Sequence, residues 1–131
     1  LGGAPGTRSK RWAGASGTAS EVDAANNAEL LRRLAGAPEA KRAARYRCAL
    51  VLVRKVGALP EVFEGECAGR ILEAPAGTGG FGYDPYFYSA ALGKSFGEAT
   101  DAEKDGVSHR GRAFALLRAA LAGDGKPVSS P

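Results

Sequence analysis

The chain has 131 residues, of which 44% are apolar and 24% are charged, a composition typical of a globular domain and not of a disordered chain. No apolar run approaches the roughly 20 residues that a membrane-spanning helix needs, and no signal peptide is predicted at the start. The net charge of +4 is uneven, because residues 1–55 carry 11 Lys and Arg against 4 Asp and Glu.

The basic first part of the chain has two interpretations. It could face an anion, such as a polyphosphate or a nucleic acid, or it could be the solvated face of a helix and its exit. Binders of single-stranded nucleic acid place several aromatic side chains among their basic residues. Only Trp12 and Tyr46 do so here, so a nucleic-acid partner is the least favoured of the hypotheses below.

The chain contains no methionine and opens on a Gly- and Pro-rich segment, residues 1–6, with the chemistry of a turn. Such a segment usually joins two elements of structure. We therefore expect Leu1 to lie inside a larger domain, with the N-terminal part of that domain absent from this sequence.

The first predicted element is an amphipathic helix over residues 23–35. Asp23 is the expected N-cap, and Gly36 is the expected end of the helix. The apolar stripe consists of Leu30, Leu31 and Leu34.

Two strands are predicted next. Residues 45–55 are apolar on both faces at their centre, as expected for a strand in a covered sheet. Residues 61–72 alternate, with one face formed by Phe63, Cys67 and Ile71 and the other by Glu64, Glu66 and Arg70. Gly65 and Gly69 suggest bends or bulges in this second strand.

The last third of the chain is predicted to be helical after an aromatic segment at residues 86–88. Thr100 and Glu103 form a capping-box signature for a helix of about one turn, which Gly106 is expected to break. Ser108 is the expected cap of a second helix that Gly123 ends, with the apolar stripe Ala113, Phe114, Leu117 and Leu121. Residues 123–131 are predicted to be a disordered tail, and residues 1–122 part of a single domain.

The two cysteines, Cys48 and Cys67, fall in the predicted strands and have no CxxC spacing and no histidine at ligand spacing. A metal site built on sulfur is therefore not expected. Unpaired cysteines of this kind behave as small apolar residues and suit a reducing, cytoplasmic location.

Residues 77–82 satisfy the G-x-G-x-x-G pattern, but the context of a dinucleotide-binding fold is missing. That fold needs a helix to begin at the loop, whereas Pro85 pushes Asp84 toward extended geometry. Two interpretations remain. The loop could approach a planar ligand, with Phe81 against its face and Asp84 accepting hydrogen bonds from ring N–H groups. It could equally be a hairpin whose aromatic side chains belong to the core.

Ser108, His109 and Arg110 form a second candidate site at the start of the last predicted helix. Backbone N–H groups at a helix start favour anions, and Arg110 adds a planar set of donors. The alternative is an ordinary capped helix with a solvated arginine. Lys104, just upstream, is either a solvated charge or a phosphate contact. A Ser–His catalytic pair is not expected, because adjacent helical residues do not face one another.

Together these segments resemble the XTP/dITP diphosphatase (inosine triphosphate pyrophosphatase) family. The matching motifs are residues 73–85 (EAPAGTGGFGYDP), Gly93-Lys94, residues 98–104 (EATDAEK) and Ser108-His109-Arg110-Gly111, preceded by residues 1–6 and 9–14. The likeness runs to about residue 122. It implies an elongated α/β fold with a mixed, twisted sheet flanked by helices and two lobes around a nucleotide cleft.

The resemblance also implies a function. Members of the family hydrolyse XTP, ITP and dITP to a monophosphate and pyrophosphate with Mg²⁺, and they usually form homodimers. By motif, Phe81, Gly82, Tyr83 and Asp84 would line the base pocket, and Lys104, Ser108, His109 and Arg110 would complete the substrate site.

The family's phosphate-binding opening and its acidic metal-binding segment have no match in this sequence. We therefore expect the catalytic and metal-binding residues upstream of Leu1, none of either kind in this chain, and no turnover by the chain alone. The alternative is a truncated or degenerate module that binds a purine nucleotide without hydrolysing it.

Overall fold

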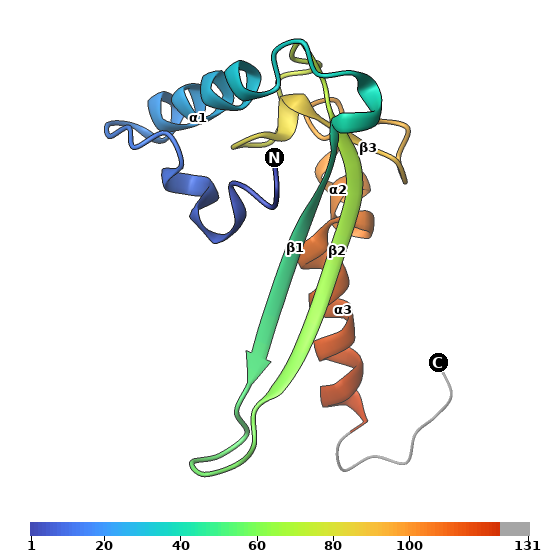
Figure 1. The fold of residues 1–131 in the computed structure, drawn as a ribbon. Helices are drawn as coiled ribbons and strands as arrows, with labels where there is room; N and C mark the ends of the chain where they lie inside the picture. The colour runs from blue at the N-terminus through green and yellow to red at the C-terminus, as the bar shows by residue number, and fades with distance from the viewer. Residues whose placement is uncertain (124–131) are drawn as a thin grey trace. The chain divides into compact units, whose positions relative to one another are not determined.

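The computed structural model describes residues 1–123, whose helices and strands are drawn in Figure 1, and it contains two compact units. Among the described residues, the first unit consists of residues 1–44 and 68–101, and the second of residues 45–67 and 102–123. The helices are α1 (Ala19–Arg33), α2 (Asp101–Val107) and α3 (His109–Ala122), and the strands are β1 (Ala43–Leu52), β2 (Glu61–Ile71), β3 (Phe87–Ser89) and β4 (Lys94–Ser95). Short 3-10 helices η1 (Gly6–Arg11), η2 (Glu39–Lys41) and η3 (Asp84–Tyr86) complete the elements.

The predicted α/β class is confirmed. The four strands follow the order β1-β2-β3-β4, and the pairs β2–β3 and β3–β4 are antiparallel. Within residues 1–123, no helix is long and apolar enough to cross a membrane. The predicted tail lies, apart from Gly123, outside the described residues, and the assignment of residues 1–122 to one domain stays a prediction.

In the first unit, α1 begins four residues earlier than predicted. The Thr18 side chain accepts a hydrogen bond from the Glu21 backbone N–H, and Glu21 accepts one from the Thr18 N–H, both at 3.2 Å. This capping box supplies the helix start, so the prediction of Asp23 as N-cap was wrong. Two of the three predicted apolar positions, Leu30 and Leu34, are buried.

The segment before α1 is held to the helix by a buried asparagine. Asn26 accepts a hydrogen bond from the Ala13 N–H and donates one to the Lys10 carbonyl, both at 2.9 Å. The guanidinium of Arg33 lies 4.8 Å from the centre of the Trp12 ring. Residues 9–13 therefore have a fixed place beside α1, which matters for the site described below.

Arg42 ties the end of α1 to the end of β2. Although it is charged, its side chain is only 6% exposed. The guanidinium donates from Nε to the Ile71 carbonyl at 2.7 Å, from Nη1 to the Leu34 carbonyl at 2.9 Å and from Nη2 to the Leu72 carbonyl at 3.1 Å. Three backbone acceptors thus compensate the burial of the charge.

The core of the first unit lies where β2, β3 and β4 meet. The rings of Phe87 and Phe96 are both buried, and their centroids lie 5.0 Å apart. Ile71 is also buried, and it pairs with Phe87 across the β2–β3 ladder. Gly69 pairs with Ser89 across the sheet, and a Cβ at Gly69 would collide with the Tyr88 carbonyl oxygen and the Phe87 ring. The glycine therefore permits close packing, and β2 runs through it without interruption.

In the second unit, β1 departs from the prediction of a strand covered on both faces. Its residues alternate between exposed and half-buried along the whole strand, and none of them is buried. Val51 and, just beyond the strand, Val53 are more than half exposed. Hydrophobicity alone therefore gave the wrong environment for this strand. Cys48 of β1 is half-buried and Cys67 of β2 is buried, and both lie in strands as predicted.

The alternation predicted for β2 is confirmed, and Gly65 marks a close contact with a helix, while the bulge predicted there stays a prediction. Phe63 and Cys67 point to the covered side, whereas Glu64 and Glu66 are exposed. A Cβ at Gly65 would collide with the His109 carbonyl oxygen. In Figure 1, α3 runs along this part of β2, and the glycine lets the first turn of the helix approach the strand.

The two last helices confirm the Ser108 cap and correct the prediction for Gly106. The Ser108 side chain accepts a hydrogen bond from the Gly111 N–H at 3.0 Å, and α3 ends at Gly123 as expected. However, α2 continues through Gly106 to Val107, so the glycine does not break it. In the predicted stripe of α3, Ala113 is buried, whereas Phe114 and Leu121 are exposed. The capping box at Thr100 and Glu103 stays a prediction.

Candidate functional site

The loop before η3 is closed by a carboxylate. The Phe81 N–H donates to Asp84 Oδ2 at 3.0 Å, and the Asp84 N–H donates to the Phe81 carbonyl at 3.1 Å. Asp84 is only 4% exposed. Gly80 has a φ of 72°, and a Cβ there would collide with the Asp84 carboxylate, so this position requires glycine. Asp84 therefore holds the loop from inside.

Phe81 stands out from this loop. Its residue is 67% exposed, unlike the neighbouring core rings of Phe87 and Phe96. This exposure argues against the interpretation in which Phe81 is a core residue of a hairpin. An exposed ring on a closed loop can present its face to a planar ligand.

The backbone beneath the loop explains two of its glycines. The Gly79 N–H donates to the Gly97 carbonyl at 2.8 Å, and the Gly97 N–H donates to the Asp84 carbonyl at 3.0 Å. A Cβ at Gly77 would collide with the backbone of Gly97. Gly77 and Gly79 thus lie close to the backbone of Gly97. The loop leads into η3 and β3 and not into an α-helix, so it lacks the helix start that a dinucleotide-binding loop needs.

Gly82 and Tyr83, which complete the predicted base pocket, are held from the N-terminal side of the unit. The Gly82 N–H donates to Asp23 Oδ2 at 2.9 Å, and Asn27 Nδ2 donates to the Gly82 carbonyl at 3.0 Å. The Tyr83 hydroxyl donates to the Ser9 carbonyl at 2.6 Å. Burial, and secondarily the negative charge of Asp23, raises the pKa of Tyr83 to about 12, so the phenol stays protonated as a donor.

The second group of predicted site residues belongs to the second unit. Lys104 lies on α2 and is half-buried, and Ser108 is buried as the cap of α3. Arg110, in the first turn of α3, is exposed. A Cβ at Gly111 would collide with the Asp105 carbonyl oxygen, so this glycine allows the tight connection between α2 and α3. The Ser108 hydroxyl is committed to the helix, which fits a structural role.

His109 is stacked on an aromatic ring that the sequence did not single out. The centroids of His109 and Tyr46 lie 4.8 Å apart with an angle of 16° between the ring planes. Tyr46 belongs to β1, in the same unit. The plane of the imidazole is therefore set by the strand as well as by the helix.

The structure thus groups the predicted site residues into two sets. Phe81, Gly82, Tyr83 and Asp84 come together in the first unit, and Lys104, Ser108, His109 and Arg110 come together in the second. Among residues 1–123, no group of three or more His, Cys, Asp or Glu side chains assembles that could hold a metal ion.

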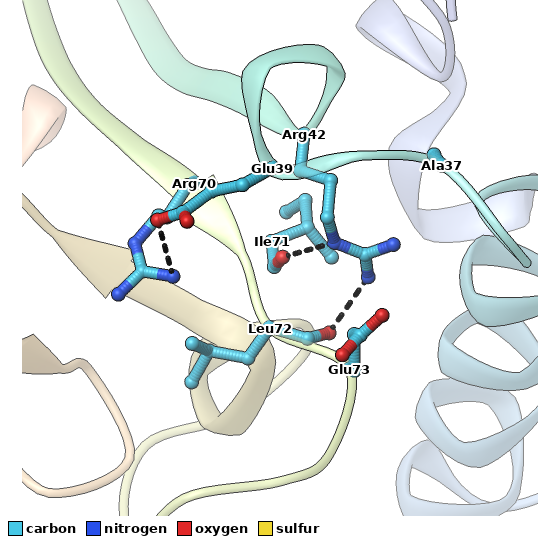
Figure 2. Close-up of a pocket in the computed structure, with 7 residues that line it drawn as sticks. All are labelled: Ala37, Glu39, Arg42, Arg70, Ile71, Leu72 and Glu73. Atoms are coloured by element: carbon cyan, nitrogen blue, oxygen red, sulfur yellow. Dashed lines mark hydrogen bonds and ion pairs between the residues drawn. The ribbon is translucent and has the colours of Figure 1, made fainter.

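A separate hollow of about 210 Å³ lies beside Arg42 in the first unit (Figure 2). Its lining includes Arg42, whose guanidinium already donates to backbone carbonyls, and Arg70, which pairs with Glu39 at 3.3 Å. Because these charges are engaged with the protein itself, the hollow is not the candidate site.

Comparison with known proteins decides the family. The sequence profile of the Ham1 family matches residues 1–120. The chain belongs to the Ham1 family.

Individual Ham1 relatives agree with this assignment. A dITP/XTP pyrophosphatase of Ralstonia nicotianae is 51% identical over 118 residues, which are 89% of this chain and 57% of the relative. The Ham1 protein of Staphylococcus aureus is 34% identical with a TM-score of 0.82, covering 92% of this chain and 59% of that one. A dITP/XTP pyrophosphatase of Mycobacterium abscessus is 43% identical with a TM-score of 0.72, covering 90% and 58%.

This Ham1 chain therefore spans about three fifths of the length of the relatives that it matches. The resemblance inferred from the motifs is confirmed at the level of the family.

Three residues at the site were missed by sequence reasoning: Asp23, Asn27 and Tyr46. Asp23 and Asn27 are four residues apart on α1, a spacing that puts them on one face. That signal was hidden because Asp23 was assigned to the helix cap, although Thr18 and Glu21 carry the capping-box pattern. No local pattern pointed to Tyr46, whose partner His109 is distant in the sequence.

Proposed function

We propose that this protein is a pyrophosphatase that hydrolyses XTP, ITP and dITP to the monophosphate and pyrophosphate, and so removes aberrant purine nucleotides from the nucleotide pool. Its Ham1 membership and the names of its relatives support this activity. The observation in the structure that carries the proposal is the closed loop at residues 80–84. Asp84 holds the backbone of this loop, and the exposed ring of Phe81 projects from it.

The loop suits recognition of a flat, polar base. The ring of Phe81 offers a stacking face, and Gly82 beside it has no side chain to obstruct a ligand. Tyr83 and Asp84 make up the rest of the proposed pocket. Because Asp84 Oδ2 already accepts the Phe81 N–H, its carboxylate fixes the backbone from which the ring projects.

The second group supplies positive charge and donors. In the proposal, Lys104 contacts the polyphosphate, with His109 and Arg110 completing the substrate site and Ser108 beside them. Arg110 has only donors to offer, so it suits the 6-oxo group of inosine and xanthine and disfavours the 6-amino group of adenine. Guanine shares the 6-oxo group, so its rejection requires a contact with its 2-amino group.

Mg²⁺ is part of the proposal, because a bound cation would stabilise negative charge on the phosphates during their cleavage by water. The described residues do not fit such an ion by themselves, since no cluster of three or more possible ligands assembles among them. We therefore assign no magnesium ligand in residues 1–123 and derive no step through the ion. A homodimeric state and a cytoplasmic location complete the proposal.

The decisive experiment is a pyrophosphate-release assay with Mg²⁺ on the intact protein, meaning this chain together with the N-terminal part that we expect upstream of Leu1. We expect turnover of ITP, XTP and dITP, with ATP and GTP hydrolysed far more slowly. Sustained turnover of all five at similar kcat/KM would overturn the proposed specificity. Binding of ITP with no release of pyrophosphate would instead identify a nucleotide-binding module.

The role of Phe81 is tested in the same assay. Phe81→Ala should weaken binding of ITP by about 1–3 kcal/mol if stacking resembles that in nucleic-acid complexes. Inorganic tripolyphosphate, which lacks a base, should inhibit the variant as strongly as it inhibits the wild type. Phe114→Ala is the matched control, because Phe114 is another exposed phenylalanine outside the proposed site. Equal losses from both variants would contradict a role in stacking.

A further inference from the structure

We propose that Asp23 and Asn27 of α1 are positioning residues that hold the Gly82 peptide and thereby set the affinity of the loop for its base. The inference rests on the proposed function. It assigns a role to two side chains outside the predicted pocket that act on it through the backbone.

The two side chains form hydrogen bonds with the same residue, one with its N–H group and one with its carbonyl group. Asp23 Oδ2 accepts the Gly82 N–H at 2.9 Å, and Asn27 Nδ2 donates to the Gly82 carbonyl at 3.0 Å. Their spacing of four residues places them one above the other on α1. A rigid helix thus satisfies both polar groups of a single loop residue.

Asp23 acts as the acceptor and Asn27 as the donor toward Gly82, and this determines how the two side chains are oriented. Asp23 accepts through a carboxylate, and hydrogen bonds to charged groups are stronger than those between neutral groups. Its other oxygen, Oδ1, lies 3.3 Å from Lys10 Nζ. Asn27 Oδ1 is buried and has no hydrogen-bond partner among the described residues, so the bond to Gly82 determines which way the amide points.

Gly82 is a position in the loop that needs such support. Its φ of 60° lies in the left-handed region, and a Cβ there would meet nothing within 4 Å. A glycine in open space is the natural hinge of a loop. Asp84 fixes the Phe81 N–H on one side of this hinge, and Ser9 fixes the Tyr83 hydroxyl on the other.

Holding Gly82 therefore keeps the exposed ring of Phe81 and the backbone of residues 81–83 in one arrangement before the ligand arrives. Pre-organisation of this kind raises affinity by removing the entropy cost of ordering the loop. It acts equally on bound substrate and on the transition state, so it should alter KM and leave kcat nearly unchanged.

The test uses steady-state kinetics with ITP on the intact protein. We expect Asp23→Ala and Asn27→Ala each to raise KM by about tenfold, the lower end of what a hydrogen bond to a charged group contributes and an upper bound for the amide. The kcat should change less than about twofold. Inhibition by inorganic tripolyphosphate should not change, because it has no base to bind.

Two further variants separate positioning from a general effect on stability. Asp23→Asn keeps an oxygen that can accept the Gly82 N–H, so its KM should lie closer to that of the wild type. Glu29→Ala is the matched control, because Glu29 also lies on α1 and its carboxylate accepts hydrogen bonds from Arg32 and Arg33 of the same helix. It should leave KM unchanged even where it lowers Tm.

Hydrogen exchange of the Gly82 amide supplies a readout that does not depend on activity. Exchange should accelerate at least about tenfold in Asp23→Ala and stay near the wild-type rate in Asp23→Asn and Glu29→Ala. An unchanged KM in a folded Asp23→Ala variant would overturn the inference. So would a Glu29→Ala variant in which KM rises and kcat falls. Failure of the wild type to hydrolyse ITP would refute the proposed function instead, with the exchange result still deciding whether the grip exists.

Discussion

Replacing Arg42 by alanine should destabilise the first unit substantially. The substitution deletes three hydrogen bonds from one buried guanidinium, to the carbonyls of Leu34, Ile71 and Leu72. These carbonyls belong to the end of α1 and the end of β2, so the arginine joins two elements that are far apart in the sequence. Figure 2 shows Arg42 with the two last of these carbonyls, which come directly before the segment that leads to the loop at residues 80–84.

The size of the loss in unfolding free energy depends on which hydrogen bonds the three carbonyls keep without Arg42. Three hydrogen bonds at about 1–1.5 kcal/mol each would give about 3–4.5 kcal/mol. However, the Leu34 carbonyl still accepts the Ala37 N–H at 2.9 Å, and water can enter from the hollow beside Arg42. These two compensations reduce the expected loss in unfolding free energy to about 2–4 kcal/mol. Arg42→Lys should recover little of it, because one ammonium cannot reproduce three divergent donors.

The measurement is denaturant unfolding followed by the fluorescence of Trp12, the one tryptophan in the sequence and a member of the first unit. Arg32→Ala is the matched control, since that arginine is exposed and its bonds run to a neighbouring side chain on the same helix. It should cause a far smaller loss. An Arg42→Ala variant that loses less than about 1 kcal/mol, or no more than the control, would refute the account of its buried hydrogen bonds.

Further predictions concern packing, stacking and charge. Gly65→Ala should lower the free energy of unfolding by at least about 2 kcal/mol, because its Cβ would collide with the His109 carbonyl oxygen. Gly106→Ala should instead stabilise α2 by about 0.5–1 kcal/mol, since nothing lies within 4 Å of its Cβ. Chemical denaturation measures both changes. Tyr46→Leu should remove the ring-current shift from the imidazole signal of His109, the one histidine in the sequence, and Tyr46→Phe should keep it; identical spectra for the two variants would contradict the stacking. Hydrogen bonds from two arginines lower the pKa of Glu29 from 4.5 to about 2, so the stability that it contributes should be complete above pH 4.5 and lost as the pH falls toward 2; a Glu29→Gln variant whose Tm deficit persists unchanged at pH 2 would disprove this.

Local chemistry predicted the ends of elements well where a single side chain decides them. The Ser108 cap and the end of α3 at Gly123 follow from residue types that satisfy the free backbone groups at helix ends. The start of α1 was mistaken because two capping candidates, Thr18 and Asp23, compete in the sequence. The reciprocal bonds of Thr18 with Glu21 decide in favour of the earlier one.

The environment of an element was harder to predict than its existence. The apolar run in β1 predicted a strand correctly, but its exposed side depends on which neighbours cover the sheet, and the sequence of one strand does not contain that information. Gly65 illustrates the same limit. A glycine in a strand is compatible with a bulge or with a close neighbour, and the approach of α3 to Gly65 could not be read from the strand's own sequence.

The candidate site divides along similar lines. The motif residues around Phe81 and Ser108 are contiguous, so their grouping within each cluster could be predicted. The contact between Tyr46 and His109, and the one between Asp23 and Gly82, join residues of unrelated local pattern at separations of about 60 residues. Such contacts leave no periodic trace in a single sequence.

The bond between Asp23 and Gly82 closes a loop of 59 residues, and the turn between β1 and β2 lies within that loop. Since β1 and β2 are neighbours in the sheet, an insertion there lengthens only the connection between them. Loop-closure entropy grows with the logarithm of length, so ten added residues would cost about 0.7 kcal/mol. The turn carries the exposed side chains of Val56 and Leu59. It is therefore a place where an epitope or a fluorescent label could be introduced while the grip on the base-binding loop stays intact, and where natural sequences can vary in length at little thermodynamic cost.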